Sequence, residues 1–225
     1  MNLTPTTAVG DIAAGHPKSL KVFHRHGIDF CCGGRRPLSE VCAKSGLDPQ
    51  TVLDQIAALE CVPDEGPNWE QEPLPALIDH LIERYHRPMD EELPRIEAMA
   101  RRVNTVHGSK DPTRFSGILT TFLALRDELV PHMVKEETIL FPWIRTGRGA
   151  EAATPVRVML IEHESVGGML HKLRELTEDY QPAPEACGTW RALFQALGDL
   201  ELDLMEHIHL ENNILFPRAL QAVAA

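Results

Sequence analysis

Apolar residues recur at helical spacing through most of this chain. From Leu74 onward they return every three or four positions, as Leu77, Leu81 and Tyr85 illustrate, and no long stretch alternates with a period of two. This pattern predicts helices rather than strands. Four long helices are expected, and they cover residues 74–107, 113–141, 152–178 and 185–216.

Short segments rich in glycine and proline separate these helices, at residues 108, 147–149 and 181–184. Four helices of comparable length joined by short loops are typical of an antiparallel four-helix bundle. The fold class predicted for this part of the chain is therefore all-α.

Prolines limit the predicted helices, because proline lacks an amide hydrogen and its ring collides with the carbonyl four residues earlier. Pro88 and Pro94 predict a kink or an early break in the first long helix. The second and fourth long helices are expected to stop near Pro142 and Pro217.

The start of the chain predicts a small helical domain that precedes the bundle. Its helices are expected over residues 17–26, 37–45 and 49–60, and Asp48 before Pro49 has the form of a helix cap. The segment between them, residues 29–34, reads Asp-Phe-Cys-Cys-Gly-Gly, and its paired glycines predict a turn.

A change of composition marks the boundary between the two parts. Residues 63–73 hold three prolines, a glycine and four acidic residues, which is typical of a linker. The predicted organisation is a small N-terminal domain over residues 1–62, the linker over 63–73 and the four-helix bundle over 74–225.

The composition narrows the classes of function. A formal net charge of −11 argues against a nucleic-acid surface, which needs a basic patch. No apolar run approaches the roughly 20 residues that span a bilayer, and the first residues do not form a signal peptide. Five cysteines are an odd number with two of them adjacent, so we expect a reducing cytoplasm instead of a disulfide framework.

One eleven-residue pattern occurs twice and carries the chemistry. The string H-x-x-x-E-x-x-I-L-F-P runs from His132 through Glu136, and again from His207 through Glu211. An imidazole and a carboxylate four residues apart lie on one helix face, one turn apart. Because the Ile-Leu-Phe triplets anchor both copies in the core, the two pairs are expected at matched depth in the bundle.

Two further histidines complete a set with one histidine on each long helix, His86 on the first and His163 on the third. Four imidazoles and two carboxylates exceed what one tetrahedral zinc ion takes. Carboxylates can bridge two ions, so the set predicts a centre of two metal ions with open coordination positions. The alternatives are exposed helix pairs or a buried polar network. The predicted metal ligands are His86, His132, Glu136, His163, His207 and Glu211.

Three further histidines and one acidic residue are not among the predicted ligands. Glu128 lies four residues before His132 and is a candidate outer partner or proton relay, against a solvated acid as the alternative. His107 lies too far along the first helix from His86 to share its site unless that helix breaks. His171 is expected in the core or beside the ligands, whereas His209 is expected to be exposed.

The adjacent Cys31 and Cys32 predict chemistry of their own, because thiolates are nucleophiles and soft metal ligands. Neighbouring cations, among them Arg35 and Arg36, are expected to lower a thiol pKa. We predict that the two cysteines act in redox exchange, in transient metal transfer or in contact with a client protein. The alternative is that they only pack inside the small domain. The other cysteines, Cys42, Cys61 and Cys187, are expected to be structural or incidental.

These motifs resemble the hemerythrin-like di-iron proteins, and more narrowly the RIC (repair of iron centres) family of the YtfE/ScdA type. The resemblance rests on the segments 84–86, 132–142, 162–164 and 207–220, together with the Cys-Cys-Gly-Gly of residues 31–34. It covers nearly the whole chain. It implies two non-haem iron ions, oxo-bridged, with the four predicted histidines as terminal ligands and Glu136 and Glu211 as bridges.

The resemblance also implies a function, the repair of iron–sulfur clusters after nitrosative or oxidative stress. Iron donation and processing of nitric oxide are the two routes. It implies damaged iron–sulfur proteins as client partners and nitric oxide or O2 as a small ligand. Neither nucleic acid nor a membrane is an expected partner, and a homodimer is left open. The alternative is a sensor or carrier of nitric oxide or O2 without turnover. A ferroxidase is disfavoured, since that class tends to use Glu-x-x-His pairs.

Overall fold

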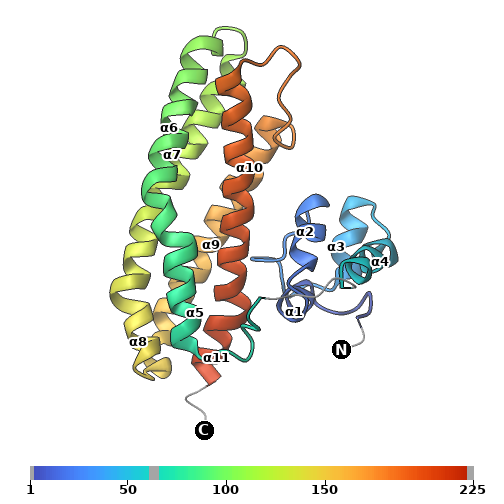
Figure 1. Cartoon of the computed structure of the whole chain (residues 1–225), viewed down its shortest axis with the longest axis vertical. Coiled ribbons are helices and arrows are strands. Elements are labelled where there is room, and N and C mark those ends of the chain that lie inside the picture. The colour runs from blue at the N-terminus through green and yellow to red at the C-terminus, as the bar shows by residue number, and fades with distance from the viewer. Residues whose placement is uncertain (1–2, 61–65, 222–225) are drawn as a thin grey trace. The chain divides into compact units, whose positions relative to one another are not determined.

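The computed structural model describes residues 3–60 and 66–221. Within them the regular elements are helices, and the one isolated bridge joins Ala8 to Pro37. Figure 1 shows the long helices side by side as a bundle, and the N-terminal domain as short helices joined by turns. The predicted all-α fold, a four-helix bundle preceded by a small helical domain, is confirmed.

Each long helical stretch of the bundle is close to its predicted range. The first is α5 (Leu74–Leu81), η1 (Ile82–His86) and α6 (Arg87–His107); the second is α7 (Pro112–Lys135), η2 (Glu136–Leu140) and α8 (Phe141–Arg145); the third is α9 (Gly149–Thr177); the fourth is α10 (Gly188–His209), η3 (Leu210–Leu215) and α11 (Phe216–Gln221). The segments named η are π-helical turns.

The structure does not have the helix ends predicted near Pro142 and Pro217, nor an early break at Pro88 or Pro94. Neither Pro142 nor Pro217 ends its helix, because a π-helical turn ends two residues before each one and the chain continues as α8 or α11. Pro88 follows η1 in the same way, and Pro94 lies inside α6 without breaking it.

The physical reason is the widened hydrogen-bond ring of a π turn. The amide of the residue before each proline bonds the carbonyl five residues back, as Phe141 does with Glu136 and Phe216 with Glu211. The extra residue in the turn moves the carbonyls relative to the proline ring, so the helix passes the proline instead of stopping.

The N-terminal domain contains α1 (Val9–Gly15), α2 (Ser19–Arg25), α3 (Leu38–Ser45) and α4 (Pro49–Glu60). Helix α1 was not predicted from the sequence. The capping prediction is confirmed, because the carboxylate of Asp48 accepts hydrogen bonds from the amides of Gln50 and Thr51 in the first turn of α4. Part of the predicted linker and Cys61 lie outside the described residues.

The described residues divide into two compact units. One takes in residues 1–78, 144–153 and 205–225, and the other takes in 79–143 and 154–204. The second unit is by itself a four-helix arrangement of α6, α7, α9 and α10. Its interior is filled by large apolar side chains such as Phe122, Leu125, Leu193 and Phe194, which are fully buried.

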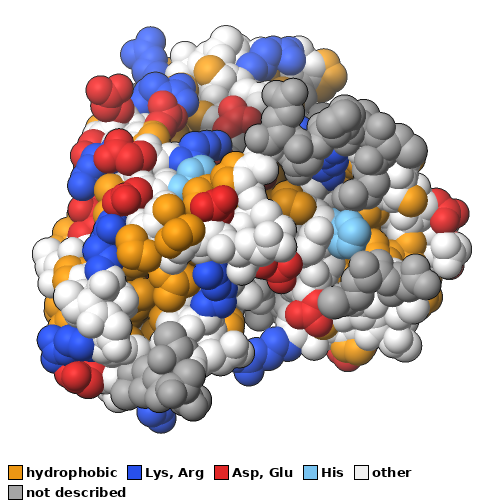
Figure 2. All heavy atoms as spheres, turned by 60° about the horizontal axis from the view of Figure 1, so that its bottom comes forward, with side chains coloured by type: hydrophobic (Ala, Val, Ile, Leu, Met, Phe, Trp, Pro, Cys, Tyr) orange, Lys and Arg blue, Asp and Glu red, His pale blue; other side chains and the backbone are white. Residues whose placement is uncertain are grey.

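The surface is mixed in character. On the face in Figure 2, acidic and basic side chains alternate with small apolar areas, and the basic ones do not gather into one tract among the residues drawn in colour. Within the described residues, none of the helices has the length and apolar character needed to cross a membrane.

Candidate metal centre

Three of the six predicted ligands lie in the π-helical turns. His86 ends η1, Glu136 begins η2 and Glu211 is the second residue of η3. A π turn shifts the side chains that follow it around the helix axis, and such turns are frequent at functional sites. The prolines after them keep these turns from relaxing into regular α-helix, so the local sequence itself sets where the ligands point.

In the second unit, three histidines surround Glu136. Its carboxylate oxygens lie 3.6 Å from Nε2 of His86 and 3.3 Å from Nε2 of His132. The Nε2 atoms of His132 and His163 are 3.1 Å apart. All four residues are at most 2% exposed.

The histidine–glutamate pair on the fourth helical stretch has the same geometry as His132 and Glu136. Nε2 of His207 lies 3.2 Å from Oε1 of Glu211, and both side chains are buried. The two copies of the sequence repeat therefore form equivalent imidazole–carboxylate pairs, as their shared spacing predicted.

Two groups of four residues bring their ligand atoms within 4.8 Å of one another. His86 and His207 form one group with the two glutamates, and His132 and His163 form the other. Glu136 and Glu211 belong to both groups, which is the arrangement that two bridged ions need.

The chemistry of this donor set fits metal ions. Two carboxylates at 0% exposure and four buried imidazoles would place two like charges in a medium of low dielectric. Bound cations compensate that charge, and mixed nitrogen and oxygen ligands suit iron.

The outer nitrogens of two of these histidines contact glutamates that the sequence analysis did not single out. Nδ1 of His86 lies 3.0 Å from Glu137, and Nδ1 of His132 lies 2.8 Å from Glu162. Such contacts orient a ligand histidine. The dipeptides Glu136-Glu137 and Glu162-His163 were the only signal in the sequence.

A surface cation holds each of these outer glutamates. Arg87 bonds Glu137 through two nitrogens, and Lys135 forms an ion pair with Glu162. For Glu162, burial raises the carboxyl pKa, but the hydrogen bonds and charges of Lys135 and His132 outweigh it, so the pKa is lowered overall. Both carboxylates are therefore held in the charged form, which accepts a hydrogen bond from an imidazole.

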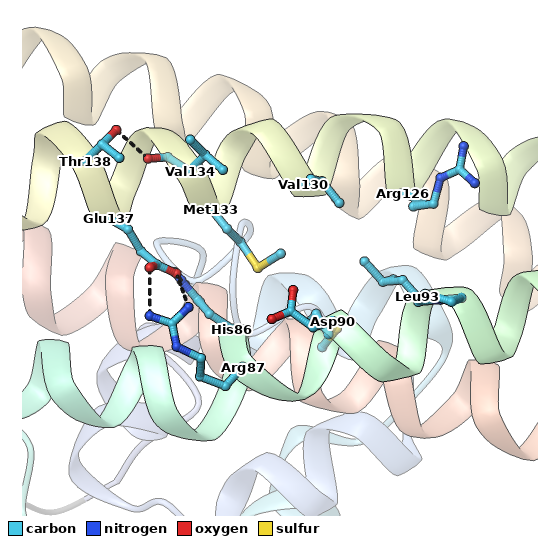
Figure 3. Close-up of a pocket in the computed structure, with 12 residues that line it drawn as sticks. His86, Arg87, Asp90, Leu93, Arg126, Val130, Met133, Val134, Glu137 and Thr138 are labelled. Carbon is cyan, nitrogen blue, oxygen red and sulfur yellow. Dashed lines mark hydrogen bonds and ion pairs between the residues drawn. The ribbon is translucent and has the colours of Figure 1, made fainter.

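A cavity of about 320 Å³ lies between α6 and α7, beside the contacts of Glu137 with His86 and Arg87. Figure 3 shows His86, Arg87 and Glu137 at one end of it and Leu93, Val130 and Arg126 at the other. Its walls are largely apolar, with Met133 between the two ends.

The other predicted residues have mixed outcomes. Glu128 is exposed on α7, and no described hydrogen bond joins it to a ligand histidine. His107 lies at the end of α6, where its Nε2 atom is 3.3 Å from Sγ of Cys187 and its ring packs against Trp190.

Two histidine predictions were wrong in opposite directions. His171 is exposed and pairs with Glu175, because eight residues turn a helix about 80° past the face of His163. His209 is buried at 1% exposure, bonds Asn213 and packs edge-on against Phe30. Burial lowers the pKa of His209 to about 4.

The Cys31–Cys32 turn is held by its own aspartate. The Asp29 carboxylate accepts hydrogen bonds from the amides of Cys31, Cys32 and Gly33. A side chain at Gly33 would collide with that carboxylate at 2.8 Å, which explains the first glycine of the motif. The side-chain amides of Asn212 and Asn213 bond the carbonyls of Cys31 and Phe30.

The expected lowering of a thiol pKa was wrong for Cys31. Its pKa is raised well above the ordinary value by the hydrogen bond with Cys32, by burial and by the charge of Asp29. Of the cations that we expected to act here, Arg36 has its guanidinium 4.0 Å from Oδ2 of Asp29, whose other oxygen contacts the Cys31 thiol.

Comparison with known proteins agrees with this geometry. Residues 77–219 match the family described as hemerythrin HHE cation binding domain, and residues 6–60 match ScdA_N, described as a domain of unknown function (DUF542). Proteins named iron-sulfur cluster repair protein YtfE, from Yersinia pestis (strain Pestoides F) and Yersinia pseudotuberculosis serotype O:1b (strain IP 31758), are 44% identical over 214 residues. The alignments cover 95% of this chain and 96% of each relative.

A helical bundle that gathers buried histidines and shared carboxylates defines a class of metal-binding proteins, and its donor set together with these matches supports a non-haem iron site. Within that class, the chain belongs to the hemerythrin HHE cation-binding family, in the form that carries an N-terminal ScdA_N domain.

Proposed function

We propose that this protein holds two iron ions in its bundle and uses them in the repair of iron–sulfur clusters damaged by nitrosative or oxidative stress. The observation that carries the proposal is the pair of four-residue groups that share Glu136 and Glu211. The similarity to proteins named for iron–sulfur cluster repair supports the biological role.

In this proposal each residue of the centre has a stated part. His86 and His207 hold one iron, His132 and His163 hold the other, and the two glutamates bridge both. Each ion then has four protein ligands, fewer than the six that iron commonly accepts. The positions left open suit release of iron or binding of a small molecule such as nitric oxide or O2, and the cavity beside His86 is a place from which such a molecule could approach.

Cys31 and Cys32 serve as the contact with the client in this proposal. Neither is in a disulfide, and Cys32 is partly exposed whereas Cys31 is buried. A half-accessible pair of thiols suits exchange of metal with an iron–sulfur protein, and vicinal thiols outside a disulfide fit a reducing cytoplasm.

The first experiment is the metal content and optical spectrum of protein purified from cells without added metal. Two irons per chain with an oxo-bridge band in the near ultraviolet support the proposal, one for each group of ligands. A single zinc per chain, or no iron after anaerobic ferrous reconstitution, would overturn it.

A second experiment separates repair from the alternative of a sensor or carrier. Iron-loaded protein is mixed with an apo iron–sulfur protein, and the recovery of the client's cluster is followed with an iron chelator as competitor. Repair predicts cluster recovery that falls in the Cys31→Ser/Cys32→Ser variant while its bundle iron stays intact. A carrier predicts reversible binding of nitric oxide or O2 and no cluster recovery.

A further inference from the structure

The N-terminal domain contains a second cluster of potential metal ligands. The carboxylate of Asp29 and the thiols of Cys31 and Cys32 bring one ligand atom each within 4.8 Å of one another. All three residues lie on the turn between α2 and α3, so one short stretch of chain determines their arrangement.

The spacing of the three ligand atoms matches a tetrahedral ion. The two sulfur atoms are 3.7 Å apart, and Sγ of Cys31 lies 3.3 Å from Oδ1 of Asp29. Two sulfur atoms bound at 2.3 Å in a tetrahedron are separated by about 3.8 Å, and a sulfur and a carboxylate oxygen by about 3.5 Å. The site could therefore take an ion with little movement of these side chains.

The turn also preorganises the carboxylate. Backbone amides of Cys31, Cys32 and Gly33 hold its two oxygens, in the way that outer hydrogen bonds orient metal ligands. The amides of Asn212 and Asn213 fix the carbonyls of the same turn, and these two residues directly follow Glu211 on η3.

We propose that Asp29, Cys31 and Cys32 form a second metal site, which binds one soft or borderline divalent ion such as Fe²⁺ or Zn²⁺ through two thiolates and a carboxylate. Three protein ligands leave a fourth tetrahedral position. That position is accessible from the side of Cys32, the partly exposed cysteine, whereas Cys31 is 4% exposed.

Binding balances as an exchange of protons for the metal. Each thiol loses its proton, two protons go to solvent, and two metal–sulfur bonds and one metal–oxygen bond form without any change of oxidation state. The negative neighbours that disfavour a lone Cys31 thiolate become favourable once a divalent cation lies among them.

An open fourth position gives the site a use in transfer, since a thiolate of a client protein can bind the same ion before the site lets it go. This use rests on the proposed repair function. The existence of the site does not, because it follows from the three ligand atoms alone.

The test is a titration of the metal-stripped full chain with Co²⁺ under anaerobic conditions. A thiolate-to-cobalt charge-transfer band reports this site specifically, because the bundle ligands are nitrogen and oxygen atoms only. We expect the band to reach the intensity of one thiolate-bound cobalt per chain, in addition to any cobalt held by the bundle ligands, with two protons released for each ion bound at this site.

Three variants decide the assignment. The band is expected to disappear in Cys32→Ser, to need at least about tenfold more cobalt in Asp29→Asn, and to be unchanged in Cys187→Ser, which removes an exposed thiol on the bundle. Asp29→Glu, which keeps the charge, serves as the conservative counterpart, and circular dichroism monitors folding.

Absence of the band in the wild-type protein, or its persistence in Cys32→Ser, would overturn the proposal. The result is independent of the repair assay. A cobalt–thiolate band without cluster recovery would leave the site standing and count against the repair function, whereas cluster recovery without the band would do the reverse.

Discussion

Glu137 determines which nitrogen of His86 carries its proton. Oε1 of Glu137 lies 3.0 Å from Nδ1 of His86, and a carboxylate held charged by Arg87 can only accept a hydrogen bond. Nδ1 is therefore the protonated nitrogen. The lone pair of the ring is on Nε2, which faces Glu136 at 3.6 Å.

Removing the Glu137 carboxylate should weaken metal binding. We expect Glu137→Ala to weaken iron binding at the His86 side by about ten- to a hundredfold, since the ring loses the group that fixes its tautomer and orientation. The measurement is the rate of iron loss to a chelator. Glu137→Gln, which can still accept a hydrogen bond, should lie between the two, and the exposed Glu91→Ala should match wild type.

The proline after η2 should matter for metal binding more than for stability. Pro142→Ala restores an amide hydrogen and allows Glu136 to Leu140 to relax into regular α-helix, which rotates Glu136 relative to the residues after it. We expect helix content to be retained and iron affinity to fall at least about tenfold.

Pro155→Ala is the matched control for this change, because Pro155 lies inside α9 and no π turn precedes it. Equal iron affinities in the two variants and the wild type, measured by competition with a chelator, would contradict the role given to the π turn.

The buried ion pair between Arg174 and Glu201 in the second unit should contribute strongly to the free energy of unfolding. Nε of Arg174 donates to Glu201 at 3.1 Å, and the Glu201 side chain is 4% exposed. Glu201→Leu removes the buried carboxylate and leaves the guanidinium with the exposed Asp179, so the free energy of unfolding should fall by about 3 kcal/mol, the low end for breaking a buried pair. Urea unfolding of metal-free protein measures this.

The double variant Arg174→Met/Glu201→Leu removes both charges and provides the control. Its stability should recover toward wild type, because an apolar pair can replace a buried ion pair at little cost. A double variant as unstable as the single one would mean that the loss comes from packing.

Stability should also depend on pH through His209. Its pKa is about 4 in the folded protein because of burial, and near 6.5 in the unfolded chain. Between these values the unfolded state binds the extra proton, so stability is fully present above pH 6.5 and is lost as pH falls toward 4. The total loss is about 3 kcal/mol.

The slope of unfolding free energy against pH in this range tests the prediction. It should be reduced in metal-free His209→Gln and unchanged in His171→Gln, which removes an exposed histidine. An equal slope in wild type and His209→Gln would show that other groups carry the pH dependence.

Much of the fold could be predicted because it depends on local periodicity. The recurrence of apolar residues gave the four long helices within a few residues of their ends, and Asp48 before Pro49 gave the start of α4. The four-residue spacing within His132–Glu136 and His207–Glu211 placed each pair on one helix face. These features need only the geometry of a helix.

Other features depended on which residues meet in space. His209 is buried because Phe30, distant in sequence, packs against its ring. No periodicity along a single helix contains that contact.

The sequence by itself determined the helices, the repeated imidazole–carboxylate pairs and the glycine turn at Cys31 and Cys32, because each is set by residues within a few positions of one another. Only the tertiary structure decided that His86 groups with His207 and that Glu137 and Glu162 orient the ligand histidines. Those relationships arise from packing and folded backbone geometry, which fix distances that spacing along the chain leaves free.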